Sequence, residues 1–182
     1  MALTKVRTGG ITADAVDNTI LDLADDFAFT GTISGTPANT PYFYGKKASN
    51  QTITRNVTTK ITGFTNNELD SDNAFDGTTF TVPSGKAGRY YFHATTASDF
   101  SGIGSDGERA LLYAYKNGGG VIFNDFFIGS SYNLVQVSNS FSWILDLSAG
   151  DYVEIFVYNK DGNASGNAFV SDGSIFFGYR LA

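Results

Sequence analysis

Residues 79–93 read TFTVPSGKAGRYYFH, and this stretch decides the fold class. Phe80 and Val82 alternate with threonines, which is the pattern of a half-buried strand. Pro83 lacks a backbone donor and ends that strand, and the glycine-containing segment after it has the composition of a turn. From Arg89 the alternation resumes, so the stretch predicts a strand, a turn and a second strand.

The second of these strands carries rings on both faces. Tyr90 and Phe92 share one face with Ala94, whereas Tyr91 and His93 share the other, because successive side chains of a strand point to opposite sides. We expect one face to be core and the other to contact solvent or a second subunit.

The composition favours a β protein. The chain has 182 residues, enough for one domain with an extension, and 15% of them are aromatic, with 16 Phe and 10 Tyr. The net charge is −6 and the basic residues are scattered, which argues against binding to nucleic acid. The absence of cysteine excludes disulfides and cysteine-based metal sites.

No apolar run approaches the length of a membrane span, so membrane insertion is not expected. The first residues, MALTK, carry no apolar segment of the kind found in signal peptides. The sequence therefore predicts a protein made in a cytoplasm, whatever its final destination.

Residues 1–40 differ from the rest and predict an N-terminal attachment or trimerisation arm with a linker. Apolar residues recur there at the a/d spacing of a short coiled coil, and an acidic, extended leader is the alternative. The segment is too short to build its own core, so we expect it to attach the chain to a larger assembly. The candidate attachment residues are Val16, Ile20, Leu23 and Phe27.

Residues 41–182 predict short strands throughout and no helix. Residues 53–64 alternate, and Asn117-Gly118 between two alternating runs is a strong hairpin signal. Phe141, Trp143, Leu145 and Leu147 share one face of a later strand, and Ile175, Phe177, Tyr179 and Leu181 share one face of the last. Nine or ten strands at this spacing predict an antiparallel two-sheet sandwich.

Four motifs, taken in order, resemble the globular heads of complement subcomponent q. They are FxVP closing on GxYxF at 80–92, YKNGGGV at 115–121, LDLSAGDYVEI at 145–155 and FFGYRL at 176–181. Two extra residues between Phe80 and Gly88 depart from the pattern of the animal members. The resemblance implies an all-β, antiparallel jelly-roll β-sandwich of about ten strands over residues 41–182, related to the tumour necrosis factor fold, and a homotrimer.

Residues 9–35, GGITADAVDNTILDLADDFAFTGTISG, resemble leader segments in virion proteins of tailed bacteriophages, especially fibres. This resemblance implies a virion structural protein, such as a tail fibre or capsid fibre, that joins other virion proteins through the arm. Its head would bind a glycan or protein of the host surface or cap the appendage. A bacterial lectin-like adhesive module and a glycan-degrading virion enzyme are the alternatives.

No catalytic residue and no cofactor are predicted. The GxGxxG match at residues 102–107 precedes a strand-like run, whereas dinucleotide binding needs a helix there. His93 is the only histidine, and no nucleophile is predicted beside it. Oxygen atoms of Asp70, Asp72 and Asp76 in one loop are calcium candidates, although the full calcium-loop pattern is absent and a solvated acidic loop is the alternative.

The aromatic residues exceed what one sandwich of this size can bury. Tyr, Phe and Trp are enriched in subunit interfaces, and a large exposed aromatic surface ordinarily marks one. Closed cyclic symmetry buries such a surface once per subunit, and the family resemblance selects three-fold symmetry. The candidate trimer-interface residues are Tyr91, His93, Tyr113, Tyr115, Phe176 and Tyr179.

Overall fold

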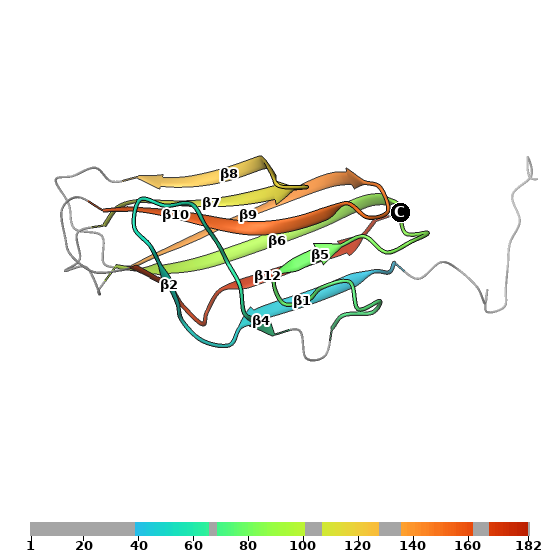
Figure 1. The fold of residues 1–182 in the computed structure, drawn as a ribbon, viewed down its shortest axis with the longest axis horizontal. Helices are drawn as coiled ribbons and strands as arrows, with labels where there is room; N and C mark the ends of the chain where they lie inside the picture. Colours follow the sequence, from blue (N-terminus) through green and yellow to red (C-terminus); the bar gives the residue numbers. More distant parts are fainter. Residues whose placement is uncertain (1–38, 66–68, 101–106, 128–135, 162–167, 182) are drawn as a thin grey trace, which may run out of the picture. The chain divides into compact units, whose positions relative to one another are not determined.

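The computed structural model describes residues 39–65, 69–100, 107–127, 136–161 and 168–181, which form an antiparallel β-sandwich (Figure 1). These residues contain twelve strands and no helix, which confirms the predicted fold class. The strands are β1 (Tyr42–Lys47), β2 (Gln51–Ile53), β3 (Thr59–Lys60), β4 (Phe64–Thr65), β5 (Thr79–Thr81), β6 (Gly88–Asp99), β7 (Gly107–Lys116), β8 (Gly119–Phe127), β9 (Gln136–Leu147), β10 (Tyr152–Asp161), β11 (Ala168–Val170) and β12 (Ile175–Arg180).

The chain divides into two units, Met1–Pro37 and Ala38–Ala182. The first unit, with the candidate attachment residues Val16, Ile20, Leu23 and Phe27, lies outside the described residues. Within the described part of the chain, no helix has the length and hydrophobicity needed to cross a membrane.

Sheet A contains seven strands and is built around β6. Strand β9 pairs with β6 over its whole length, from Gly88 opposite Leu147 to Asp99 opposite Gln136. On its other edge, β6 pairs with β12 and then with β11. Strand β1 pairs with β12, β4 with β1, and β2 with β11, so the first and last strands of the domain lie side by side (Figure 1).

Sheet B contains five strands, with β10 paired to β7 on one edge and to β5 and β3 on the other. Strand β8 pairs with β7 and ends this sheet. The β7–β8 hairpin turns at Asn117 and Gly118, whose φ angles of 51° and 79° are the left-handed values that a two-residue turn of type I′ requires. The predicted hairpin is therefore confirmed.

The sheet edges formed by β8 and β9 are joined by hydrogen bonds from Asn124 and Asn139. We call this pair of residues the asparagine clasp. The Nδ2 group of Asn124 on β8 donates to the Oδ1 atom of Asn139 on β9 at 2.6 Å and to the carbonyl of Ser140 at 3.0 Å. In return, Nδ2 of Asn139 donates to the carbonyls of Asn124 and Ala110, both at 3.1 Å. The clasp connects sheet A to sheet B where no backbone ladder between them exists in the described residues.

The main core is a cluster of stacked aromatic rings between the sheets. Phe43 lies at its centre, with ring centroids 4.6 Å from Phe75, 4.9 Å from Phe80 and 4.9 Å from Phe176. Tyr90, Phe92 and Ala94 on β6 are also fully buried, which confirms the faces predicted for that strand. Rings of this size dominate core energetics because each removes a large apolar area from water.

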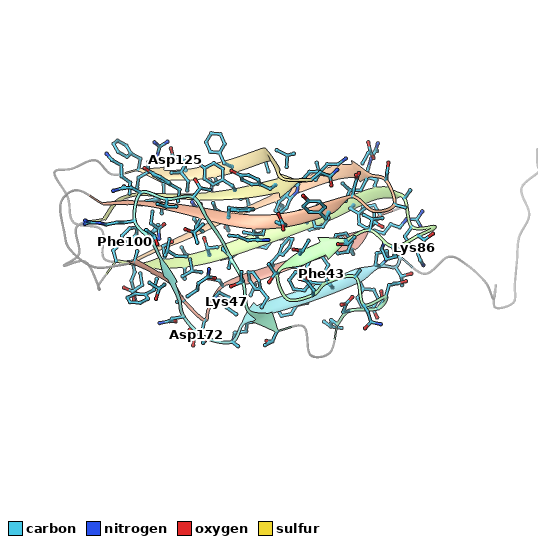
Figure 2. The ribbon with its side chains drawn as sticks, viewed as in Figure 1. Phe43, Lys47, Lys86, Phe100, Asp125 and Asp172 are labelled. Atoms are coloured by element: carbon cyan, nitrogen blue, oxygen red, sulfur yellow. The ribbon has the colours of Figure 1, made fainter. Side chains whose placement is uncertain are left out.

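A second, smaller core lies toward the other end of the strands (Figure 2), and it consists of Phe100, Ala110, Val137 and Ala168. Buried polar residues occupy the strand positions between the two clusters. They are Thr96, Ser98, Asn139 and Asn159. The Oγ atom of Ser98 donates to Oδ1 of Asn159 at 3.3 Å, so part of this layer is satisfied internally.

Gly178 explains why the FFGYRL motif contains a glycine. A Cβ atom at Gly178 would lie 2.5 Å from Cδ1 of Phe92 and 2.9 Å from the carbonyl oxygen of Tyr91. The ring of Phe92 fills the space where a side chain would project, so a larger residue would force the ring or β12 to move.

The structure corrects the single strand predicted over residues 53–64. That segment contains the end of β2, then β3, and the start of β4. Asn56 has a φ of 58°, a left-handed value that interrupts an extended chain. The break lets β3 join sheet B while β2 and β4 belong to sheet A.

Candidate functional site

The outer face of sheet A carries aromatic side chains that the core does not use. Tyr91 and His93 point outward from β6 because Tyr90 and Phe92 point into the core. Neighbouring positions on β12 and β1 continue the row across the sheet, and three of the tyrosines are 37–41% exposed. We call this surface the sheet A aromatic face; it consists of Tyr42, Tyr44, Tyr91, His93, Phe177 and Tyr179.

Five of the six rings of this face, all but Tyr42, touch one another in a continuous layer. The ring centroid of Phe177 lies 5.1 Å from His93 and 6.2 Å from Tyr44. Tyr91 lies 6.3 Å from Phe177 and 5.3 Å from Tyr179. Because such contacts hold the rings in place, the face presents a preformed apolar surface, which is a feature of protein interfaces.

Strand β9 extends the same face with Ile144, which lies opposite Tyr91 and is 55% exposed. An aliphatic side chain this exposed, beside a layer of rings, enlarges one contiguous apolar patch. Ile144 therefore belongs to the candidate interface, although the sequence analysis did not select it.

His93 is held at this face by two hydroxyl groups. Its Nδ1 atom lies 2.8 Å from Oγ of Ser142, and its Nε2 atom lies 2.9 Å from Oγ1 of Thr95. The hydroxyl of Tyr91 also donates to Oγ of Ser142 at 2.9 Å. Burial lowers the pKa of His93 below its ordinary value of 6.5, so the ring is neutral at neutral pH.

This serine–histidine contact does not make a hydrolytic relay. In such relays one ring nitrogen contacts the nucleophile and the other donates to a carboxylate that orients the base. In this protein the second nitrogen of His93 contacts the hydroxyl of Thr95. The arrangement is a cross-strand hydrogen-bond network within the aromatic face.

Every residue of β8 is exposed, which is unusual for a strand with so many apolar residues. Phe127 and Phe123 are 62% and 58% exposed. Ile122 and Phe126 lie opposite Ala114 and Ala110, which face the core, so these two side chains lie on the side of the strand toward β9. Asp125 is the one charged residue of β8, and it is paired with Arg109, so an edge strand with this many exposed apolar side chains is a ready contact for another chain.

The outer face of sheet B carries a second aromatic row. Tyr113 on β7 lies opposite Phe156 on β10 and Phe123 on β8. Tyr115 contacts Phe156 at a centroid distance of 4.2 Å. This row belongs to a different sheet from the sheet A aromatic face.

The structure separates the six predicted interface residues into three groups. Tyr91, His93 and Tyr179 share the sheet A aromatic face. Tyr113 and Tyr115 lie on sheet B, so they do not form one patch with the first three. Phe176 is fully buried among the core rings, and its prediction as an interface residue is wrong.

Two further aromatic residues of the sheet A aromatic face, one half-buried and one exposed, were not predicted from the sequence. Phe177 and Tyr44 lie at the centre of the face. The signal was present, because Phe177 shares its strand face with Tyr179, but rings at both 176 and 177 left open which one pointed inward.

The predicted calcium candidates serve the loop between β4 and β5. The carboxylate of Asp70 accepts the backbone N–H groups of Ala74 at 2.8 Å and Phe75 at 3.1 Å. Asp76 likewise accepts two backbone N–H groups, and Asp72 lies 3.7 Å from Nζ of Lys86. Among the described residues, no group of three or more acidic, histidine or cysteine side chains is placed to bind a metal ion.

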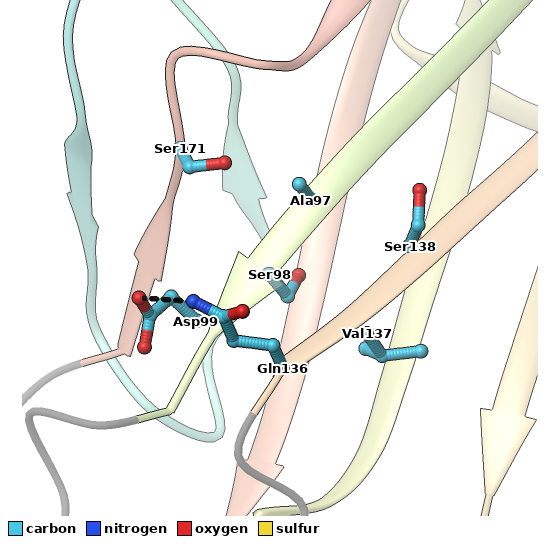
Figure 3. A pocket seen from close by; sticks show the side chains of 7 residues that line it. All are labelled: Ala97, Ser98, Asp99, Gln136, Val137, Ser138 and Ser171. Atoms are coloured by element: carbon cyan, nitrogen blue, oxygen red, sulfur yellow. Dashed lines mark hydrogen bonds between the residues drawn. The ribbon is translucent and has the colours of Figure 1, made fainter.

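A small polar pocket of about 200 Å³ lies where β6, β9 and β11 come together (Figure 3). Its walls include the hydroxyls of Ser98, Ser138 and Ser171. Nε2 of Gln136 donates to Oδ2 of Asp99 at 3.0 Å across one side. Among the described residues that line it, Asp99 is the one carboxylate.

The comparisons with known proteins concern the fold. No family model and no curated protein matches the sequence. Among solved structures, the globular domain of zebrafish complement 1qA is similar, with a TM-score of 0.55 and 19% identity over 79% of this chain and 98% of that chain.

Two further similar structures belong to the tumour necrosis factor family. Murine APRIL gives a TM-score of 0.54 and 10% identity over 77% of this chain and 98% of that chain. Eiger TNF from S. frugiperda gives a TM-score of 0.54 and 12% identity over 78% of this chain and 90% of that chain. The described residues therefore have the jelly-roll fold of complement q heads and tumour necrosis factors, as the sequence resemblance implied.

Proposed function

We propose that this protein is a non-enzymatic structural and binding module that assembles into a homotrimer through the sheet A aromatic face. The observation that carries the proposal is the layer of touching rings on an exposed sheet surface, with Phe177 at its centre. A soluble monomer rarely leaves so large an aromatic patch in water. Burial between subunits removes it.

Two different apolar surfaces on one chain support three-fold over two-fold symmetry. A two-fold contact uses one self-complementary patch, whereas a ring of three brings two different patches together. One patch here is the sheet A aromatic face with Ile144. The other is the side of β8 that carries Ile122 and Phe126. In the proposed trimer, the β8 edge of each subunit contacts the aromatic face of the next.

The proposed setting is a bacteriophage virion, in which the trimer forms the head of a tail fibre, capsid fibre or similar appendage. The support is the resemblance of residues 9–35 to leader segments of phage fibre proteins. In this proposal residues 1–40 attach the head to other virion proteins, and the head contacts the host surface or caps the appendage.

The trimer is tested by placing a charge in the proposed contact. Ile144→Asp puts a carboxylate into the surface that the trimer would bury, and we expect it to yield monomers, because an unpaired buried charge is strongly unfavourable. Val57→Asp is the matched control, since Val57 is 49% exposed and lies in neither patch. Analytical ultracentrifugation measures the oligomeric state of both variants. An Ile144→Asp trimer as stable as the trimer of the control would contradict the proposal.

The virion setting has its own test. Mass spectrometry of purified virions from the phage or prophage that encodes the chain should detect it among the structural proteins. Deletion of residues 1–35 should leave a trimer that fails to join the particle. Incorporation of the shortened chain at the normal level would refute attachment through the arm, and a gene placed beside a bacterial secretion system would favour the adhesive module instead.

A further inference from the structure

A groove of about 500 Å³ lies on the outer side of the β7–β8 hairpin. It is separate from the sheet A aromatic face because all of its residues belong to sheet B. Its walls are aromatic and aliphatic, without a charged residue. We call it the β7–β8 groove; it is lined by Tyr113, Tyr115, Gly120, Val121, Ile122 and Phe123.

The groove continues a row of four rings that crosses three strands. Phe156 and Tyr115 are 4.2 Å apart between centroids, Tyr115 and Tyr113 are 6.2 Å apart, and Tyr113 and Phe123 are 5.7 Å apart. Each step is comparable to the width of one sugar ring. The rings stand on one sheet face, but their planes are tilted against one another, by 34° between Tyr115 and Phe156, 79° between Tyr113 and Tyr115 and 44° between Tyr113 and Phe123.

The Tyr115 ring is half-buried, and a glycine lies opposite it on β8. The pairing shifts between Ala114 and Tyr115, which places Gly120 opposite Tyr115. A Cβ atom at Gly120 would lie 3.7 and 3.8 Å from two atoms of the Tyr115 ring, which is ordinary contact. Gly120 is not in a left-handed conformation, so the backbone does not require glycine there. The glycine instead keeps the ring surface open.

Polar groups lie beside this row of rings. The hydroxyls of Tyr113 and Tyr115 have no hydrogen-bond partner among the described residues. Near the Tyr113 end, Arg109 and Asp125 form a two-bonded ion pair, with Nε to Oδ1 at 2.8 Å and Nη2 to Oδ2 at 2.6 Å. Asp125 lies on the outer side of β8 (Figure 2). The pair has further donors and acceptors that hydroxyl groups could use.

We propose that the β7–β8 groove and its row of rings bind a neutral, linear, gluco-configured oligosaccharide. Sugars of this configuration have an apolar face of C–H groups that packs on aromatic rings, while their hydroxyls hydrogen-bond at the rim. Rings set in a row across three strands suit an extended chain, such as the chains that β-1,4 linkages give. The net charge of −6 disfavours polyanionic glycans.

This inference names the class of host-surface ligand within the proposed function. The groove lies within one chain, however, so sugar binding does not require the trimer. A second copy of the chain is the other occupant that the aromatic lining could accept. The hydroxyls and the ion pair favour the sugar, because they would remain unpaired against an apolar partner.

The test compares two glycine variants of the full-length protein by isothermal titration calorimetry with cellopentaose, chitopentaose and maltopentaose. The Cβ atom of Gly120→Val would lie against the Tyr115 ring at ordinary contact distance, whereas the Cβ atom of Gly119→Val, one residue away, would meet only the carbonyl oxygen of Lys116 at 3.6 Å. We expect saturable binding of cellopentaose or chitopentaose by the wild type and by Gly119→Val, and binding at least about tenfold weaker by Gly120→Val. Tyr115→Phe should keep most of the affinity, and Tyr115→Ala should lose it.

Three results would overturn the inference. The first is that neither cellopentaose nor chitopentaose binds saturably. The second is that maltopentaose binds more tightly than both of them. The third is that Gly120→Val binds the sugar as tightly as the wild type. Sedimentation of the same samples separates this inference from the proposed function. Sugar binding by a monomer would contradict the trimer alone, whereas a Gly120→Val variant that loses the trimer would identify the groove as a subunit contact instead.

Discussion

Removal of the asparagine clasp should destabilise the fold, because the clasp joins the two sheets at the β8–β9 side. In Asn139→Ala, the carbonyl of Ala110 loses its bond from the Asn139 amide, and Asn124 loses two of its bonds. The bond to Ala110 is buried, and each of the three lost hydrogen bonds costs about 0.5–1.5 kcal/mol. We expect a total loss of about 2–4 kcal/mol, which is non-additive with Asn124→Ala.

Urea unfolding at a fixed chain concentration measures this loss, because the stability of an oligomer depends on concentration. The double variant Asn124→Ala/Asn139→Ala should be less destabilised than the sum of the single variants, since both remove the same bonds. Ser138→Ala, an exposed serine on the same strand, is the control and should leave stability unchanged. An Asn139→Ala protein as stable as the wild type, or strict additivity of the two asparagine variants, would refute the role assigned to the clasp.

Two further predictions concern the last strand and the turn before β10. Gly178→Ala should lower the free energy of unfolding by about 1–3 kcal/mol, because its Cβ would collide with Phe92, whereas Gly173→Ala should not; equal midpoints in urea for the two variants would contradict this. Hydrogen bonds from Asn117, Lys116 and the backbone of Ser148 lower the pKa of Asp151 from 3.8 to about 2. The ionised carboxylate therefore contributes fully to the stability of the fold above pH 3.8, and this contribution is lost as the pH falls toward 2. Asp151→Asn should flatten that part of the curve of stability against pH, and an unchanged acid slope would refute the assignment.

The fold could be predicted because short-range patterns determine much of it. The alternation at 90–94 assigned the inner and outer faces of β6, and Asn117-Gly118 located the hairpin, since both depend on neighbours in sequence. The strand predicted over 53–64 failed where Asn56 adopts a left-handed conformation. Asparagine tolerates that conformation without requiring it, so the sequence alone gave no clear break.

The candidate site was predicted in part because faces and sheets depend on long-range pairing. Phe176 and Phe177 are both aromatic, and only the register with β6 and β1 shows that Phe176 points inward. Likewise, nothing local separates Tyr113 from Tyr91, although one belongs to sheet B and the other to sheet A.

The burial of Lys47 could likewise not be predicted from its neighbours in the sequence. It is 4% exposed, and its amine donates to the carbonyl of Thr62 at 2.6 Å. A lysine at the end of a strand is ordinarily expected to be solvated. Its burial here depends on the segment after β3, which contains Thr62.

Three copies of this chain should assemble through the sheet A aromatic face, and native mass spectrometry of the full-length protein at micromolar concentration measures how many chains do so. We expect one dominant species at three times 19.5 kDa. A stable single chain of 19.5 kDa, or a two-chain species, would contradict it.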